Sequence, residues 1–251
     1  MKLTRLTLIP CLALALFLSA AALGAENTNK WETSAAAGLS LTRGNSKTLL
    51  ATVGINSKHK TPVDEILLAV AGAYGENTIK NSGGKEETQK TRESLSALGQ
   101  YNRSFSEDWY GGVRLDFLHD EIADLKYRFT VSPLVGYYAL KKPMTTLKFE
   151  AGPSGVFERQ GTNDNQYAAL RLGERFEQKF NPKAKMWQSF DYIAQVDRLQ
   201  KYLLIFELGT EAALTEKFSL RAVLQDNYEN EPAPHRKNND IKLITSLVYK
   251  F

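Results

Sequence analysis

Hydrophobic and polar residues alternate in the last twelve residues of the chain, 240–251. The odd positions of this stretch are mostly apolar: Ile241, Leu243, Thr245, Leu247, Tyr249 and Phe251. A period of two places them on one face of a β-strand and most of the polar groups on the other. The pattern would suit an edge strand of a soluble sandwich, but a half-apolar strand that ends on an aromatic residue is typical of the closing strand of an outer-membrane barrel.

The same alternation recurs between breaks that are rich in Gly, Pro, Asn, Asp or charged residues. The predicted strands cover residues 31–42, 48–59, 65–77, 91–105, 109–119, 127–140, 144–159, 166–180, 186–197, 202–214, 218–228 and 240–251. Single-chain bacterial barrels have an even number of strands. We therefore predict an all-β fold, an antiparallel up-and-down transmembrane β-barrel of about 12 strands.

The connections between these strands alternate in length. Short turns (KTPVD, SED, KKP, NPKAK and TEK) are expected at the periplasmic end, whereas the two longest connections, TIKNSGGKEETQK and NEPAPHRKNN, are expected outside. This is the asymmetry of outer-membrane barrels, and the even strand number brings Phe251 back to the periplasmic side.

Aromatic residues gather near the strand ends. One group is expected at the periplasmic interface: Trp31, Phe105, Trp109, Phe180, Trp187, Phe218 and Phe251. A second group is expected at the outer interface: Tyr74, Phe117, Tyr127, Phe129, Phe157, Tyr167, Tyr202 and Tyr228. Two aromatic girdles around an aliphatic band favour a membrane barrel over a sandwich, whose aromatics would fill the core.

The N-terminus predicts export. Lys2 and Arg5 precede an apolar run over residues 6–18 and then small residues, which is the order of a cleaved signal peptide. We expect residues 1–25 to be removed and residues 26–251 to form a single outer-membrane barrel domain. Cys11, the one cysteine, lies in the removed part, so the mature chain has no disulfide or thiolate site.

Charge argues against nucleic-acid binding. The chain has 32 Lys and Arg against 28 Asp and Glu, and removal of Lys2 and Arg5 leaves 30 against 28. A surplus of two positive charges does not form the basic surface that nucleic acids need.

Three residues do not fit a simple strand pattern. Glu174 falls on the lipid-facing phase, which predicts a bulge, a register error or a protein contact. Pro133 and Pro153 lie inside strands that have no free edge. They are equidistant from the intervening turn, so we expect them to face each other, with a bulge or weakened ladder toward the outer rim.

The turn TRGNSKT at residues 42–48 follows the first strand, and LKFEAGPSGVFE at 147–158 and DFLHDEIADLKYRFTVSPLVGYY at 116–138 come later. The chain ends on a spaced set of residues: Tyr228, Pro232 or Pro234, Asp240, Tyr249 and Phe251. In these motifs the sequence resembles the salt-induced outer-membrane protein (YdiY-like) family, a domain of unknown function among the outer-membrane barrels. Pro133 departs from the family pattern. The resemblance covers the mature chain and implies fold and location but no reaction.

By strand phase, a set of charged residues points into the lumen: Arg114, Asp116, Arg128, Lys148, Glu150, Arg171, Arg175, Glu177, Lys179, Asp191, Glu207, Glu211 and Arg221. Charges of both signs suggest cross-strand ion pairs, of which Glu211 with Arg221 is one. Two interpretations stay open: a barrel plugged by side chains, with a structural or envelope-stress role, and a narrow porin-like pore.

Other functions have weaker support. A lipid hydrolase would use His119, with Ser94 roughly level with it, but acyl transfer also needs an oriented base. The acidic loop after His119 lacks calcium-loop spacing. A surface-binding role would use the outward loops, which lack aromatic anchors. We therefore predict a non-enzymatic barrel without catalytic residues, metal or cofactor.

The expected partners follow from the location. They are outer-membrane lipids and lipopolysaccharide, and the barrel-assembly machinery, which would read Leu247, Tyr249 and Phe251 of the last strand as an assembly signal. We expect a monomer in the outer membrane of a Gram-negative-type bacterium, exported through the periplasm.

Overall fold

The structure, a computed structural model, describes residues 29–43, 46–80, 86–122, 124–231 and 238–251. The expected signal peptide, with Cys11, lies outside these residues, as does His235. In the described part of the chain, no helix is long and apolar enough to cross a membrane.

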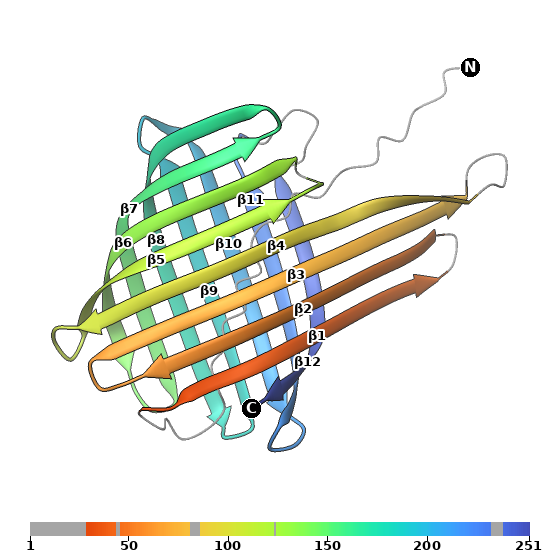
Figure 1. Cartoon of the computed structure of the whole chain (residues 1–251). Coiled ribbons are helices and arrows are strands. Elements are labelled where there is room, and N and C mark those ends of the chain that lie inside the picture. The colour runs from red at the N-terminus through yellow and green to blue at the C-terminus, as the bar shows by residue number, and fades with distance from the viewer. Residues whose placement is uncertain (1–28, 44–45, 81–85, 123, 232–237) are drawn as a thin grey trace.

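Twelve strands make up the fold of the described residues (Figure 1). They are β1 (Trp31–Arg43), β2 (Ser46–Lys60), β3 (Asp64–Lys80), β4 (Glu86–Ser104), β5 (Trp109–Asp120), β6 (Leu125–Lys141), β7 (Thr145–Gln160), β8 (Asn163–Asn181), β9 (Ala184–Gln195), β10 (Arg198–Ala213), β11 (Phe218–Glu229) and β12 (Asn239–Lys250). Each pairs antiparallel with its neighbours in sequence, and β1 pairs with β12, so the sheet closes into a barrel. The predicted fold class and strand number are confirmed.

The two faces of the wall differ in chemistry. Large apolar side chains are exposed on the outside of most strands, among them Val53, Val70, Leu115, Leu172 and Leu243. Buried polar and charged side chains fill the inside of the same strands. A sheet that closes on itself and has an apolar exterior is the arrangement of membrane-spanning barrels.

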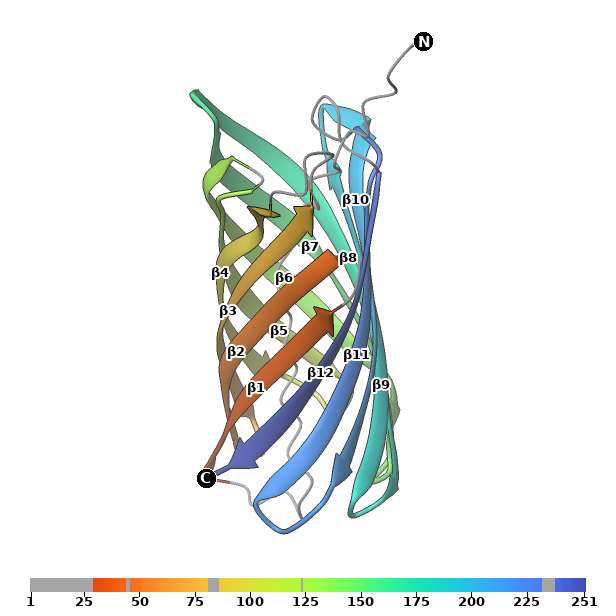
Figure 2. The same cartoon turned by 90° about the vertical axis from the view of Figure 1, so that its right-hand side faces the viewer.

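The connections differ from the expected pattern at one end. Short turns join the strands at the end where the C-terminus lies, as predicted (Figures 1 and 2). At the opposite end, most of the expected loop at residues 78–90 is strand, because β3 continues to Lys80 and β4 begins at Glu86. The hydroxyls of Thr78 and Thr88 hydrogen-bond across this extension at 2.6 Å. The β7–β8 and β9–β10 connections at this end are tight, two-residue turns.

The seam between β1 and β12 is short. The two strands pair over five positions, from Ser34 with Lys250 to Gly38 with Ser246. In the same register residues 39–43 would face residues 241–245, yet no pairing joins them. The two strands lie side by side near the C-terminus in both views, and in Figure 1 β1 runs away from β12 toward its far end.

A second interruption lies between β6 and β7. Their pairing stops after Val131 with Gly155 and resumes at Val135 with Ala151 in the same register, so Pro133 faces Pro153 across the gap. The predicted weakening of the ladder is confirmed without a bulge at this site. Its expected place near the outer rim is wrong, because Pro133 is at the centre of β6.

The aromatic girdles need two corrections. Trp187 is 1% exposed, and its neighbours in β9 show that it points into the lumen rather than toward lipid. Tyr167 lies opposite the buried Val156 and also points inward. The Trp187 ring fills space inside the barrel next to Gly209.

Glu174 lies on the lipid-facing side of β8 in a regular stretch of the ladder, between Phe149 of β7 and Phe190 of β9. A bulge and a register error are therefore excluded as explanations. Its carboxylate accepts a hydrogen bond of 2.7 Å from the Gln188 side-chain amide, which supplies a polar partner on the outer wall.

Candidate functional site: the lumen of the barrel

The charged residues that strand phase assigned to the lumen lie on the inner face of the wall. They come from β5 to β11: Arg114, Asp116, Arg128, Lys148, Glu150, Arg171, Arg175, Glu207, Glu211 and Arg221. Of these, Glu207, Glu211 and Arg221 are at most 2% exposed. Unpaired charges at such burial would be costly, so their partners decide what the lumen can do.

A packed polar network covers the wall formed by β9 to β12. Arg221 and Glu211 are direct cross-strand neighbours and form the ion pair expected from the sequence, at 2.7 Å. Lys250 of β12 lies 3.4 Å from the same carboxylate. Glu207 accepts hydrogen bonds from the Trp187 indole at 2.6 Å and the Gln225 amide at 2.9 Å. This side of the lumen is filled by side chains.

Two aromatic side chains lie against glycines of the adjacent strand. A Cβ added to Gly209 would lie 2.0 Å from the Trp187 ring, and one added to Gly136 would lie 2.0 Å from the Tyr110 ring. The Tyr110 hydroxyl donates to Glu150 at 2.8 Å, as the Trp187 indole does to Glu207. Each ring thus holds a lumenal carboxylate in place. Neither residue was assigned to the lumen from the sequence, although a glycine directly opposite an inward position is the signal that could have found them.

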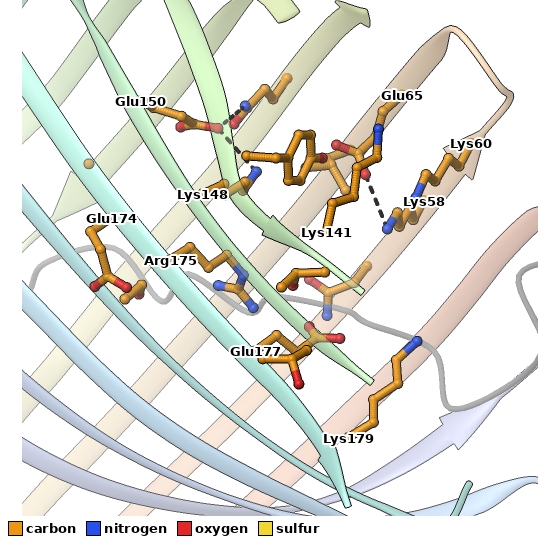
Figure 3. A pocket seen from close by; sticks show the side chains of 18 of the residues that line it. Lys58, Lys60, Glu65, Lys141, Lys148, Glu150, Glu174, Arg175, Glu177 and Lys179 are labelled. Carbon is orange, nitrogen blue, oxygen red and sulfur yellow. Dashed lines mark hydrogen bonds and ion pairs between the residues drawn. The ribbon is translucent and has the colours of Figure 1, made fainter. Parts of the chain in front are cut away.

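A cavity of about 880 Å³ occupies the lumen on the side of β2 to β9. It reaches the end of the barrel that carries the short turns, because Lys142, Pro143 and Pro182 of those turns line it. Nine basic residues line it: Lys58, Lys60, Arg114, Lys141, Lys142, Lys148, Arg171, Arg175 and Lys179. Four acidic residues face it: Glu65, Glu150, Glu177 and Asp191. Glu174 also borders the cavity (Figure 3). Its carboxylate accepts a hydrogen bond from Gln188.

Glu150 is the centre of the cavity's inner end. Its carboxylate lies 3.1 Å from the Lys148 ammonium and 3.2 Å from the Arg171 guanidinium. The amide of Gln100 on β4 donates to it at 3.1 Å. Arg171 also contacts Asp191 at 2.6 Å. These bonds cross between β4, β7, β8 and β9 and hold the side chains that line this part of the cavity in place.

An apolar cluster lies nearer the opposite end of the barrel. Leu118 of β5, Leu125 of β6 and Ile205 of β10 form it, and Ile193 and Leu203 pack against it. Lumens of membrane barrels are normally polar. Apolar side chains that meet across a lumen exclude water and ions, so this cluster is a candidate constriction.

The hydrolase hypothesis receives no geometric support. Ser94 lies opposite Asp120 and points to the inner face of the wall, whereas His119 lies on the outer phase of β5. The His119 Nδ1 is 2.9 Å from the backbone oxygen of Lys126 and its Nε2 is 3.9 Å from Glu121. The structure therefore does not bring the serine and the imidazole together. Within the described residues, no group of three or more His, Cys, Asp or Glu side chains could hold a metal ion.

The last strand has apolar residues on both faces. Ile241, Leu243 and Leu247 are exposed outside, while Ile244 and Val248 are buried inside. The Tyr249 ring lies between Phe218 and Phe251, with centroids 5.2 and 5.0 Å away. The three residues of the expected assembly signal are thus on the outer face of the seam or at its end.

The sequence matches the family described as "Protein of unknown function, DUF481" over residues 35–251. No curated protein matches the chain significantly. Among solved structures, the KdgM porin is 8% identical, with a TM-score of 0.48 over 88% of this chain and 99% of the porin. An outer membrane channel from Pseudomonas putida F1 is 10% identical, with a TM-score of 0.48 over 91% and 99%. The translocator domain of the autotransporter NalP from Neisseria meningitidis is 11% identical, with a TM-score of 0.47 over 88% and 87%. The likeness is one of barrel architecture.

Proposed function

Because the chain belongs to the DUF481 family of proteins of unknown function and folds as a closed barrel of the outer-membrane type, we propose that it is a narrow outer-membrane channel for small solutes. The observation that carries the proposal is the cavity of about 880 Å³ inside the lumen. A barrel with a purely structural role has no need of a charge-lined space of this size at one end.

The orientation of the channel follows from its turns. Outer-membrane barrels keep their short turns and C-terminus in the periplasm, so the cavity would be a periplasmic vestibule. The cluster of Leu118, Leu125 and Ile205 would then be the constriction between the vestibule and the outside. We propose that this conformation is the closed one, since an apolar constriction conducts ions only when it is wetted.

Planar-bilayer recording tests the proposal. The barrel with Leu118→Ser and Ile205→Ser is expected to be open about tenfold more of the time than wild type, because hydroxyls let water into the constriction. Leu98→Ser is the matched control, since Leu98 lines the wide part of the lumen. Silence of both wild type and the double variant, with each barrel shown to be folded by its heat-modifiable migration, would reject the channel.

A sealed structural barrel is the second candidate, and the packed network of Arg221, Glu211 and Trp187 favours it. The sealed barrel predicts a different result in the same planar-bilayer recording. A sealed barrel stays silent when the constriction is made polar, because its closure would come from the network rather than from the apolar cluster.

A further inference from the structure

The charged groups of the vestibule divide into two sets. In the paired set, each acidic side chain is bonded to a basic one. Lys58 lies 3.1 Å from Glu65 close to the β2–β3 turn, and Arg171 joins Glu150 to Asp191 further from the turns. Within each of these groups the opposite charges largely neutralise one another. The ion pairs also satisfy the carboxylates that would otherwise repel an anion.

The second set also lies toward the mouth and is mostly basic. Arg175 and Lys179 follow each other on the inner face of β8, with Glu177 between them (Figure 3). Lys141 and Lys142 approach from the end of β6 and its turn. Among the described residues, none of these four cations forms an ion pair with a carboxylate. Lys141 instead donates to the backbone oxygen of Glu107 and lies 5.0 Å from the centre of the Tyr138 ring.

We infer that this mouth is a binding site for small multivalent oxyanions, that is, solutes that carry several carboxylate or phosphate groups. Four cations against one carboxylate give a local excess of positive charge, and a recess with walls of low dielectric focuses that field on an entering solute. Arg175 can bind such a group through two parallel hydrogen bonds, while the lysines act as point charges.

The size of the vestibule suits this class of solute. Sites for small molecules usually enclose about 300–1,000 Å³, so about 880 Å³ holds a small organic anion with part of its hydration shell. The two cations on β8 and the two near the β6–β7 turn come from neighbouring hairpins. A solute with two or more anionic groups can reach both pairs, whereas a monovalent ion can use only one.

A phospholipid headgroup is the other source of the same chemistry. Lys141 and Lys142 are exposed near the membrane interface and could meet a headgroup from outside the barrel. Arg175 and Lys179 point into the lumen, where bilayer lipid does not reach. The inference therefore commits to soluble anions, and variants on β8 distinguish the two sources.

Calorimetric titration of the purified barrel in a neutral detergent, with citrate and with pyrophosphate, tests the site. The double variant Arg175→Gln, Lys179→Gln is expected to bind both probes at least about tenfold more weakly than wild type. Lys183→Gln with Lys217→Gln is the matched control, because it removes the same charge from exposed turns at the same end of the barrel without touching the vestibule. It is expected to change binding less than about twofold at moderate salt.

An equal loss of binding in the control variant would overturn the inference. The anions would then be attracted by all the basic residues at this end of the barrel and not by the vestibule in particular. Binding of spermidine as tight as that of citrate, or unchanged binding in the β8 variant, would also overturn it. Vesicles of anionic phospholipid that compete with citrate for wild type but not for Lys141→Gln, Lys142→Gln would assign the site to a headgroup and reject a soluble ligand.

The inference rests on the channel function, but the two can fail separately. Titration needs no current through the barrel. Binding of both probes to a barrel that stays silent in the bilayer would reject the channel and keep the site. Currents without measurable binding, and without a difference between chloride and potassium permeability in a salt gradient, would keep the channel and reject the site.

Discussion

Gly209 of β10 provides the sharpest test of how the lumen is packed. It is the register neighbour of Trp187, and a Cβ at this position would lie 2.0 and 2.1 Å from two carbons of the indole. The Gly209→Ala substitution must displace the ring, which is only 1% exposed. Overpacking of this kind costs about 1–3 kcal/mol.

The displaced ring also loses a hydrogen bond. Its indole N–H donates to Glu207 at 2.6 Å, and the loss leaves a buried carboxylate with one donor fewer. Such a loss costs about 1–3 kcal/mol, so the expected fall in the free energy of unfolding is about 2–6 kcal/mol in total. Urea unfolding of the barrel in phospholipid vesicles, followed by circular dichroism and linear extrapolation, measures it.

Gly72→Ala is the matched control, because the nearest atoms to its added Cβ lie 3.8 and 3.9 Å away. It is expected to change the free energy of unfolding by less than about 0.5 kcal/mol. In the background of Trp187→Leu, Gly209→Ala should cost less than about 1 kcal/mol, which gives a coupling energy of at least about 1 kcal/mol. The reasoning is refuted if Gly209→Ala costs no more than Gly72→Ala, or if its cost is the same without the indole.

Three further predictions concern the wall and its seam. Arg221→Met is expected to lower the free energy of unfolding by about 3 kcal/mol, because it leaves the buried charge of Glu211 with one cation fewer beside it. The double variant Arg221→Met, Glu211→Leu should restore part of that loss, and an equal loss in both variants would contradict the prediction. Deletion of Phe251 should reduce the amount of folded barrel in outer-membrane fractions far more than Phe218→Ala does, and equal amounts would show that the last residue is no assembly signal. Amides that face the seam in the outer halves of β1 and β12 should exchange hydrogen faster than those in the five paired positions, whereas uniform protection would mean that the seam is closed.

The sequence predicts most of the fold because strand periodicity is a local signal. A lipid-facing side chain must be apolar at every second position, so the alternation that predicts the closing strand also assigns Arg221 and Glu211 to the lumen. The equal distance of Pro133 and Pro153 from one turn predicts their register for the same reason. These predictions depend only on residues within one strand or one hairpin, and not on the side chains across the barrel.

The rest depends on contacts that no single strand encodes. Trp187 points into the lumen because Gly209, on the next strand, leaves room for its ring. The β3–β4 hairpin continues beyond the apolar band, where polar residues on both faces remove the periodic signal. The vestibule is missed for a third reason, because Lys58, Lys141 and Arg175 come from distant parts of the chain that only barrel closure brings to one space.

The short seam gives the wall unequal stiffness around its circumference. Eleven of the twelve strand-to-strand contacts are long ladders, but β1 and β12 are joined at one end only. A barrel in which every pair of neighbouring strands is joined along its full length can change its cross-section only if all of the strand pairs bend slightly. This barrel can instead widen where β1 and β12 are unpaired, while their five paired positions hold the two strands together at the other end. Any widening of the lumen should therefore be largest at the far end of the seam, and the girth of the barrel at the vestibule should stay nearly constant.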